Sequence, residues 1–177
     1  MEDTLRIPKS KIGILIGQKG STRRDLEKTF GVTLSIDEEG SVIVSSEDGF
    51  ALWQATKAVK GIGRGFNIDA VKKLKKEDYD LIVINLESVV GHKSKDIERY
   101  KGRVIGQGGK TKKYIETATN TEICLSGKTV SIIGNSADAH HAKEAIGIII
   151  DGAEIKTLYS YLYKVRKEQE ESELLGI

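Results

Sequence analysis

The sequence has one cysteine, one proline and no apolar run that approaches the length of a membrane span. Because Cys124 is alone, the sequence offers neither a disulfide framework nor a cysteine-based metal site. The single proline, Pro8, argues against a proline-rich adaptor, and the regular spacing of apolar residues argues against disorder. The first residues lack the charged and then apolar layout of a signal peptide. We therefore expect a soluble, cytoplasmic protein that does not enter the membrane.

The sequence also lacks the residue groups that catalysis or cofactor binding needs. No nucleophile–base pair, paired carboxylate or cluster of metal ligands stands out. His140 and His141 are adjacent, and adjacent helical side chains point about 100° apart, so the two do not readily share one ion. The run from Gly109 to Thr111 resembles the end of a P-loop, but Val104 stands where that pattern needs glycine. We therefore expect no enzymatic activity, no metal and no cofactor.

Positive charge is concentrated in two segments, although the formal net charge of the whole chain is only +2. Residues 9–24 include five bases and no acid, and residues 92–113 include eight bases and two acids. The rest of the chain is therefore net negative. This clustering is the electrostatic pattern of a protein that binds a polyanion, and the alternative interpretation is two solvated helix faces.

Each basic segment contains the same glycine motif. The first copy reads Ile16-Gly17-Gln18-Lys19-Gly20 and the second reads Ile105-Gly106-Gln107-Gly108-Gly109. After one further residue, each copy continues with a threonine and two bases. Glycine permits a sharp turn and the close approach of another backbone. The helix that we expect to start after each motif would offer N–H groups and a positive dipole end to a phosphate.

The repeat extends well beyond the motif, which predicts one folding unit used twice. Matched pairs include Leu26 with Ile115, Glu27 with Glu116, Gly31 with Asn120, Leu34 with Ile123, Ala55 with Ala142, Ile62 with Ile149 and Gly65 with Gly152.

Hydrophobic periodicity and turn residues predict the same order of elements in both copies. In the first copy we expect a strand at 4–7, helices at 9–16 and 21–30, strands at 32–37 and 41–46, and a helix at 48–64. In the second copy we expect a strand at 80–86, helices at 95–105 and 111–119, strands at 121–125 and 129–133, and a helix at 137–150 capped by Ser136. A charged helix at 66–76 follows the first copy, and a helix at 155–171 with a frayed acidic end follows the second.

Two GXXG motifs in matched strand–helix–corner–helix–strand–strand–helix units resemble the KH domains of the eukaryotic type, type I. This resemblance implies an α+β fold of two tandem βααββα domains, each a three-stranded antiparallel sheet with helices on one face. On this basis the first KH domain covers residues 1–65, a helical linker covers 66–78, the second KH domain covers 79–153, and a C-terminal helix covers 154–177.

A closer resemblance covers nearly the whole chain. The run Gly61-Ile62-Gly63-Arg64-Gly65-Phe66, the run Lys101 to Gly106 and the run Gly127 to Val130 resemble those of the archaeal KH proteins of rRNA processing, the relatives of the eukaryotic partner-of-Nob-one protein. This resemblance implies binding to single-stranded RNA in the 3′ region of small-subunit rRNA during ribosome maturation. It also implies association with the alpha subunit of translation initiation factor two and with other ribosome-assembly factors.

KH domains hold about four nucleotides against the GXXG backbone, and the resemblance places the bases in an apolar groove. The residues assigned to RNA in this way are Ile12, Ile16, Gly17, Gln18, Lys19, Gly20, Arg23, Arg24, Arg103, Ile105, Gly106, Gln107, Gly108, Gly109, Lys110, Lys112 and Lys113. Leu15, Val104 and Ile123 are further candidates for the groove, with plain core packing as the alternative.

The second loop departs from the usual pattern, because it has no base between its glycines and Lys110 must serve instead. A competing interpretation is a protein–protein adaptor in translation initiation or ribosome assembly, with RNA binding secondary. Intact glycine loops with clustered bases favour the RNA-binding interpretation.

Overall fold

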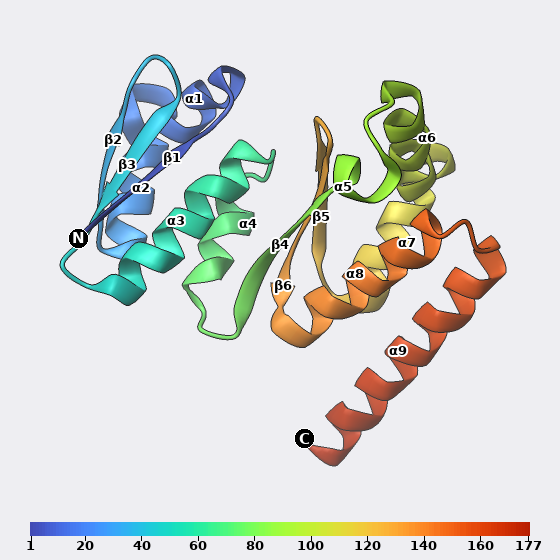
Figure 1. Ribbon diagram of the computed structural model, residues 1–177. Helices are drawn as coiled ribbons and strands as arrows, with labels where there is room; N and C mark the ends of the chain where they lie inside the picture. Colours follow the sequence, from blue (N-terminus) through green and yellow to red (C-terminus); the bar gives the residue numbers. More distant parts are fainter. The chain divides into compact units, whose positions relative to one another are not determined.

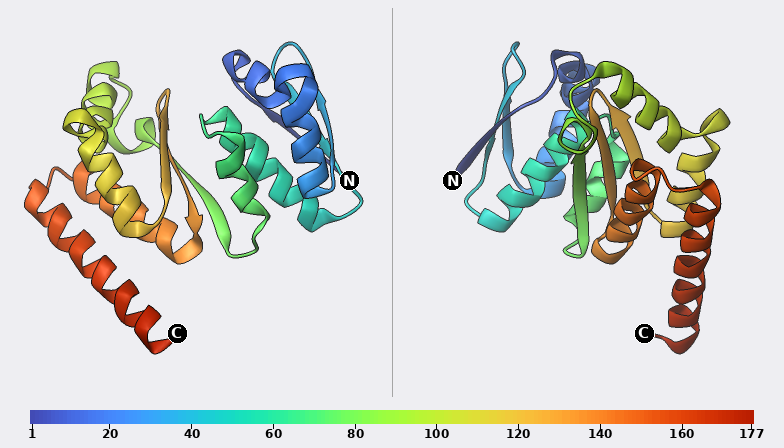
Figure 2. Two further views of the ribbon diagram at one scale, coloured as in Figure 1. Left: turned by 180° about the vertical axis from the view of Figure 1, so that it is seen from behind. Right: turned by 45° about the vertical axis from the view of Figure 1, so that its right-hand side comes forward.

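The structure, a computed structural model, describes residues 1–177 and divides into two compact units, Met1–Leu81 and Ile82–Ile177. Both units are α+β, and Figures 1 and 2 show the helices of each unit on one face of its sheet. Residues 66–78 fall within the first unit. The finer domain boundaries given above stay a prediction.

The first unit repeats the predicted order of elements. In chain order they are β1 (Glu2–Arg6), α1 (Lys9–Ile16), the short 3-10 helix η1 (Gln18–Gly20), α2 (Ser21–Phe30), β2 (Thr33–Ile36), β3 (Ser41–Ser45), α3 (Gly49–Gly63), α4 (Ile68–Lys72) and the 3-10 helix η2 (Lys73–Lys75).

The sheet of the first unit is antiparallel, with β3 between β1 and β2. Val42 and Val44 of β3 are buried whereas Ile43 between them is exposed. Successive side chains of a strand point to opposite faces, so this alternation fixes which face receives the helices.

The second unit repeats this order with one short helix added after its first strand, and it has the same topology, with β6 between β4 and β5. Its elements are β4 (Tyr79–Asn85, which begins at the end of the first unit), α5 (Leu86–Val90), α6 (Ser94–Ile105), the 3-10 helix η3 (Gln107–Gly109), α7 (Lys110–Thr119), β5 (Glu122–Ser126), β6 (Thr129–Asn135), α8 (Ser136–Ile150) and α9 (Ile155–Leu175).

The internal repeat is confirmed in three dimensions. Gly31 and Asn120 both end their helix in the left-handed conformation, at φ 72° and φ 54°. This is the usual way to satisfy the last carbonyls of a helix, and glycine and asparagine are the residues that tolerate it. The matched apolar pairs are buried in both units: Leu26 and Ile115, Leu34 and Ile123, Ala55 and Ala142, and Ile62 and Ile149.

Several predicted elements differ from the structure in length or capping. The helix predicted at 66–76 is only the short α4 followed by the 3-10 turn η2. It begins after Asn67, whose side chain caps α4 by accepting a hydrogen bond from the Ala70 amide. The short helix α5 was not predicted. The N-cap of α8 is Asn135 and not Ser136, because the Asn135 side chain accepts from the Ala137 amide at 3.1 Å.

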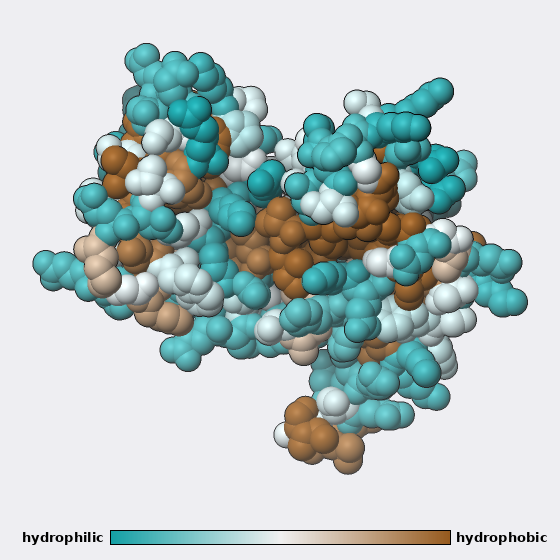
Figure 3. Space-filling model, viewed as in Figure 1, coloured by the Kyte–Doolittle hydropathy of each residue, from teal (hydrophilic) through white to brown (hydrophobic).

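The last helix is longer than predicted, because α9 runs on through the acidic stretch to Leu175. Its end exposes Leu174, Leu175 and Ile177, which form the apolar tip visible in Figure 3. None of the helices in the chain combines the length and the apolar character that crossing a bilayer requires.

Candidate nucleic-acid interface

The two glycine loops have the same backbone conformation. Gly17 and Gly106 follow the last residue of α1 and of α6, at φ 74°, ψ 175° and φ 74°, ψ 174° respectively. Gly20 and Gly109 precede α2 and α7, both at φ 75°. All four positions lie in the region that L side chains rarely adopt, so glycine is required by conformation in both copies.

The first glycine of each loop is also required by close packing. A Cβ on Gly17 would lie 2.2 Å from the Thr22 hydroxyl oxygen, and a Cβ on Gly106 would lie 2.1 Å from that of Thr111. These threonines stand in the first turn of the following helix. Each loop therefore folds back onto its own helix, which fixes where its backbone N–H groups lie.

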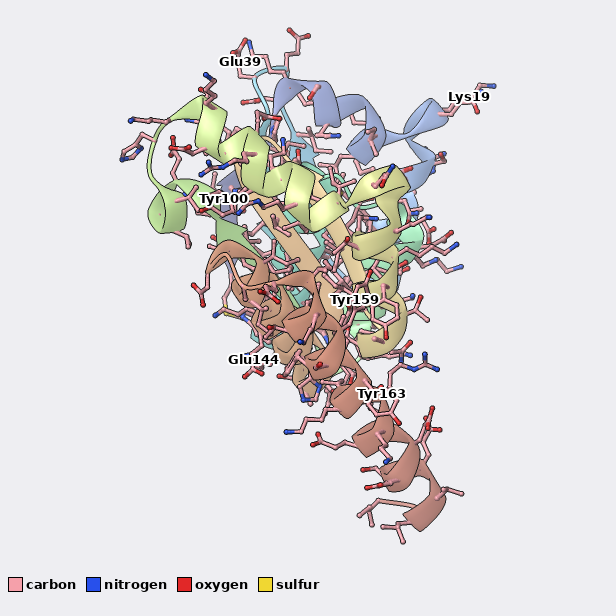
Figure 4. The ribbon with its side chains drawn as sticks, turned by 90° about the vertical axis from the view of Figure 1, so that its right-hand side faces the viewer. Lys19, Glu39, Tyr100, Glu144, Tyr159 and Tyr163 are labelled. Carbon is pink, nitrogen blue, oxygen red and sulfur yellow. The ribbon has the colours of Figure 1, made fainter.

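The middle of the loop is where the two copies differ. Lys19 and Gly108 occupy the same left-handed position, at φ 52° and φ 62°. Lys19 is one of only two non-glycine residues with positive φ in the chain. Figure 4 shows its side chain pointing away from the body of the unit. The Arg24 guanidinium donates a hydrogen bond to the Lys19 carbonyl at 2.7 Å, which holds the strained turn in place.

Neither helix that follows a loop has a side-chain cap. Gly20 and Gly109 are the N-cap residues, and glycine has no side chain to accept from the first-turn amides. The amides of Gly20 and Gly109 donate to the Gly17 and Gly106 carbonyls, and the next amide in each copy donates to the Gln18 or Gln107 carbonyl. The ends of α2 and α7 therefore offer an anion their positive dipole ends.

The predicted bases divide into free and paired cations. Lys112 pairs with Glu116 at 3.1 Å, and Arg23 lies 3.9 Å from Glu27. Both pairs have i,i+4 spacing, a signal that the sequence did contain. The predicted lysines that are exposed and make no ion pair are Lys19, Lys110 and Lys113. Since paired cations are partly neutralised, these three lysines, together with Arg24 and Arg103, which also make no ion pair, carry most of the available charge at the loops.

The two glutamates have a second role that was not predicted from the sequence. Glu27 accepts a hydrogen bond from the Leu34 amide at 2.9 Å, and Glu116 accepts one from the Ile123 amide at 3.0 Å. Each carboxylate thereby ties the helix after the loop to the start of the hairpin. The signal was available, because Glu27 and Glu116 match in the internal repeat.

The predicted apolar groove is only partly accessible. Ile12 and Ile16 are partly exposed and Ile105 is exposed, so these side chains can contact a base. The further candidates Leu15, Val104 and Ile123 are buried, so plain core packing is the right interpretation of these three.

Two glycines in the helices before the loops complete the accessible surface. Gly13 in α1 and Gly102 in α6 stand four residues before the first loop glycine, and each carbonyl accepts a hydrogen bond from that glycine at 2.9 Å. A Cβ at either position would meet no atom within 4 Å. The helix backbone is therefore bare on this side, so that a flat group could approach it closely. This matched pair was not among the residues predicted from the sequence.

The remaining predicted residues lie beside the loops. Gln18 and Gln107 are exposed at equivalent positions. The Arg103 guanidinium lies over the Tyr100 ring at 5.3 Å. Arg103 also lines a pocket of about 350 Å³, together with Gly106, Thr111, Ile155 and Leu158. In the second unit the loop therefore borders a pocket that the start of α9 completes.

No group of three or more His, Cys, Asp and Glu side chains is placed to hold a metal ion. The chemistry that the loops offer is that of binding: a glycine backbone at the positive end of a helix, lysines without ion pairs and a strip of accessible isoleucine.

Comparisons with known proteins identify these units. A family model described as the eukaryotic-type KH domain, KH-domain type I, matches residues 80–167, and a model described as the KH domain matches residues 2–57. The chain is 38% identical over 170 residues to a KH domain-containing protein of Methanocaldococcus jannaschii, which covers 94% of this chain and 74% of that protein.

Solved structures agree with these matches. The crystal structure of Dim2p from Pyrococcus horikoshii superposes with a TM-score of 0.86 at 36% identity and covers 93% of this chain and 99% of that one. A chain in the crystal structure of a complex of a/eIF2alpha, aDim2p and rRNA from the same organism matches with a TM-score of 0.87 at 35% identity, over 95% of both chains.

Eukaryotic relatives are longer than this chain. The pre-rRNA-processing protein pno1 of Schizosaccharomyces pombe is 31% identical over 119 residues, which is 67% of this chain and 49% of that protein. The chain thus spans about half the length of the eukaryotic relatives that it matches. The chain has two KH units and resembles Dim2p along nearly the whole length of both chains. It therefore belongs to the Dim2p family of tandem KH proteins.

Proposed function

We propose that both GXXG loops bind single-stranded RNA, each by receiving the phosphate backbone against its glycines and lysines. The observation that carries this proposal is the shared conformation of the two loops, glycine for glycine. The role is one of binding, without catalysis.

The residues divide this work according to their chemistry. Gly17, Gly20, Gly106 and Gly109 allow the phosphates to come close to the backbone. Lys19, Lys110 and Lys113 neutralise them, and Ile12, Ile16 and Ile105 receive the bases. Arg23 and Lys112 support this surface through their ion pairs with glutamates, and Arg24 supports it through its hydrogen bond to the Lys19 carbonyl.

We further propose that the RNA is the 3′ region of small-subunit rRNA and that the protein acts in ribosome maturation. Family membership supports the rRNA assignment, since relatives are named as pre-rRNA-processing proteins and one was crystallised in a complex with rRNA. The two units should raise each other's affinity, because a strand held by one loop is presented to the other at high effective concentration.

A protein partner forms part of the proposal. In the Pyrococcus complex, the alpha subunit of translation initiation factor two accompanies Dim2p and rRNA. We propose that this chain also binds that subunit, alongside other ribosome-assembly factors. Calorimetric titration of the two proteins checks this, and no binding at about 10 μM would contradict it.

Binding of an oligonucleotide that matches the 3′ end of small-subunit rRNA tests the choice of RNA. We expect tighter binding to it than to a scrambled strand, and weak binding to a duplex, because an A-form duplex does not present splayed bases to an apolar groove. With about four to six phosphates neutralised, log K should fall against log salt with a slope of roughly −3 to −4. Equal affinity for all three RNAs would contradict the choice of RNA, and a flat salt dependence would contradict phosphate contact.

A further inference from the structure

Aromatic side chains gather on one surface of the second unit. Tyr114 of α7 and Tyr159 and Tyr163 of α9 are three of the six tyrosines in the chain, and with Ser160 they line an open pocket of about 490 Å³. The rings of Tyr114 and Tyr159 meet edge to face, with centroids 4.8 Å apart and planes at 72°. Figure 4 shows Tyr159 beside α7 and Tyr163 further along α9. We call these three side chains the tyrosine platform.

Attachment of α9 does not account for the whole platform. Leu158, Leu162 and Val165 are the buried side chains of α9 and hold it on the unit. On the side facing α8, the Tyr161 hydroxyl donates to Glu144 at 2.6 Å, and burial together with this carboxylate raises the pKa of Tyr161 so that it stays a donor. Tyr163 is 63% exposed and Tyr159 is 39% exposed, so each leaves much of its side chain in solvent.

Free cations surround the platform. Lys110 stands one helical turn before Tyr114 on α7, and on α9 Lys156 and Lys167 stand seven residues before and four after Tyr163, on the same face. The Lys167 ammonium lies 5.9 Å from the Tyr163 ring centroid. None of these three lysines pairs with a carboxylate. The Glu170 carboxylate, on the turn after Lys167, lies 3.9 Å from the Arg166 guanidinium and pairs with that arginine instead.

The platform continues directly from the second GXXG loop. Helix α7 begins at Lys110, immediately after Gly109, and Tyr114 follows four residues later. At 1.5 Å per residue this is about 6 Å along the helix axis. Phosphate groups held at the loop therefore lie one helical turn from an exposed aromatic surface with its own cations.

Exposed aromatic rings next to free bases are the combination that binds single-stranded nucleic acid by stacking. We propose that the tyrosine platform, with Tyr163 as its most accessible ring, stacks bases of the RNA strand that leaves the second GXXG loop. The site would extend RNA contact beyond the nucleotides that the loop itself holds. This inference rests on the proposed function.

The test uses the full chain and single-stranded RNA of two lengths. One oligonucleotide has about four nucleotides, the length that one KH loop holds, and the other has about twelve and carries 2-aminopurine at successive positions. Tyr163→Ala should weaken binding of the longer strand about tenfold and leave the short strand unaffected. The salt slope should stay unchanged, because no phosphate contact is lost. 2-Aminopurine fluorescence should be quenched at one position with wild type and should recover with the variant.

Tyr163→Phe is the matched control, because it keeps the ring and removes only the hydroxyl. It should bind as wild type does, and a loss equal to that of Tyr163→Ala would overturn stacking. Unchanged affinity of Tyr163→Ala for the longer strand, with no positional quenching, would also overturn the inference. If the variant lost only binding to a protein partner, the platform would be a protein-docking surface and the inference would be wrong. In each case, aspartate at both variable positions of both GXXG loops would still abolish RNA binding if the proposed function holds. This control separates a failure of the platform inference from a failure of the proposed function.

Discussion

Aspartate at both variable positions of a loop should weaken RNA binding more than any other change of similar size. For the second loop the substitutions are Gln107→Asp and Gly108→Asp, and for the first loop Gln18→Asp and Lys19→Asp. Two unit charges about 4 Å apart interact by roughly 1 to 4 kcal/mol in surroundings between bulk water and a protein surface. We expect a loss of about 10- to 100-fold for one loop, and no measurable binding when both loops are changed.

The structure offers a neutral control of matching shape. Lys19 and Gly108 lie in the left-handed region, which asparagine and aspartate tolerate better than other side chains. Gln107→Asn with Gly108→Asn should therefore keep the loop and bind RNA within a few fold of wild type. If the asparagine pair lost as much affinity as the aspartate pair, loop conformation and not charge would explain the result. If the protein with aspartate in both loops bound RNA at wild-type affinity, the loops would not be the site.

A second large effect is expected on stability, from Gly106→Ala. The alanine would adopt a backbone conformation at φ 74°, ψ 174°, which costs roughly 1 to 3 kcal/mol for a residue with a Cβ. Its Cβ would also lie 2.9 Å from the Thr111 amide nitrogen, a backbone atom that cannot rotate away. We expect about 2 to 3 kcal/mol of lost stability in the second unit, together with reduced RNA binding.

Gly108→Ala is the comparison for this change. Gly108 also has positive φ, but a Cβ there meets no atom within 4 Å, so only the cost of the left-handed conformation applies, about 1 kcal/mol. Urea unfolding followed by far-ultraviolet circular dichroism measures both variants. The fluorescence of Trp53, the only tryptophan, reports the first unit as an internal reference. Equal midpoints for the two variants would contradict the role assigned to Thr111.

The fold was predictable because both copies carry the same signals in the same order. The helices predicted after the loops stop just before Gly31 and Asn120, and the structure confirms both ends. The short helix α5 was missed, since five residues of ordinary composition carry no periodicity. The helix predicted at 66–76 was too long, because a charged, regular pattern does not reveal the point at which the chain tightens into a 3-10 turn.

The accessible surface was less predictable than the fold. Leu15 and Ile16 are neighbours of the same chemical type, yet one is fully buried and the other partly exposed. Periodicity identifies an apolar face, but only packing against other elements decides which edge of that face stays open. The pairing of Arg23 and Lys112 with glutamates one turn away was, by contrast, readable from their spacing.

Amide signals of the loop glycines, followed by nuclear magnetic resonance during titration with single-stranded RNA, test the central claim most directly. Gly17, Gly20, Gly106 and Gly109 belong to the two proposed phosphate sites, and glycine amides resonate in a sparsely occupied part of the spectrum. The account predicts that the largest shifts occur at these four amides, in both units, and at similar RNA concentrations. Saturated binding that left all four signals in place would contradict it.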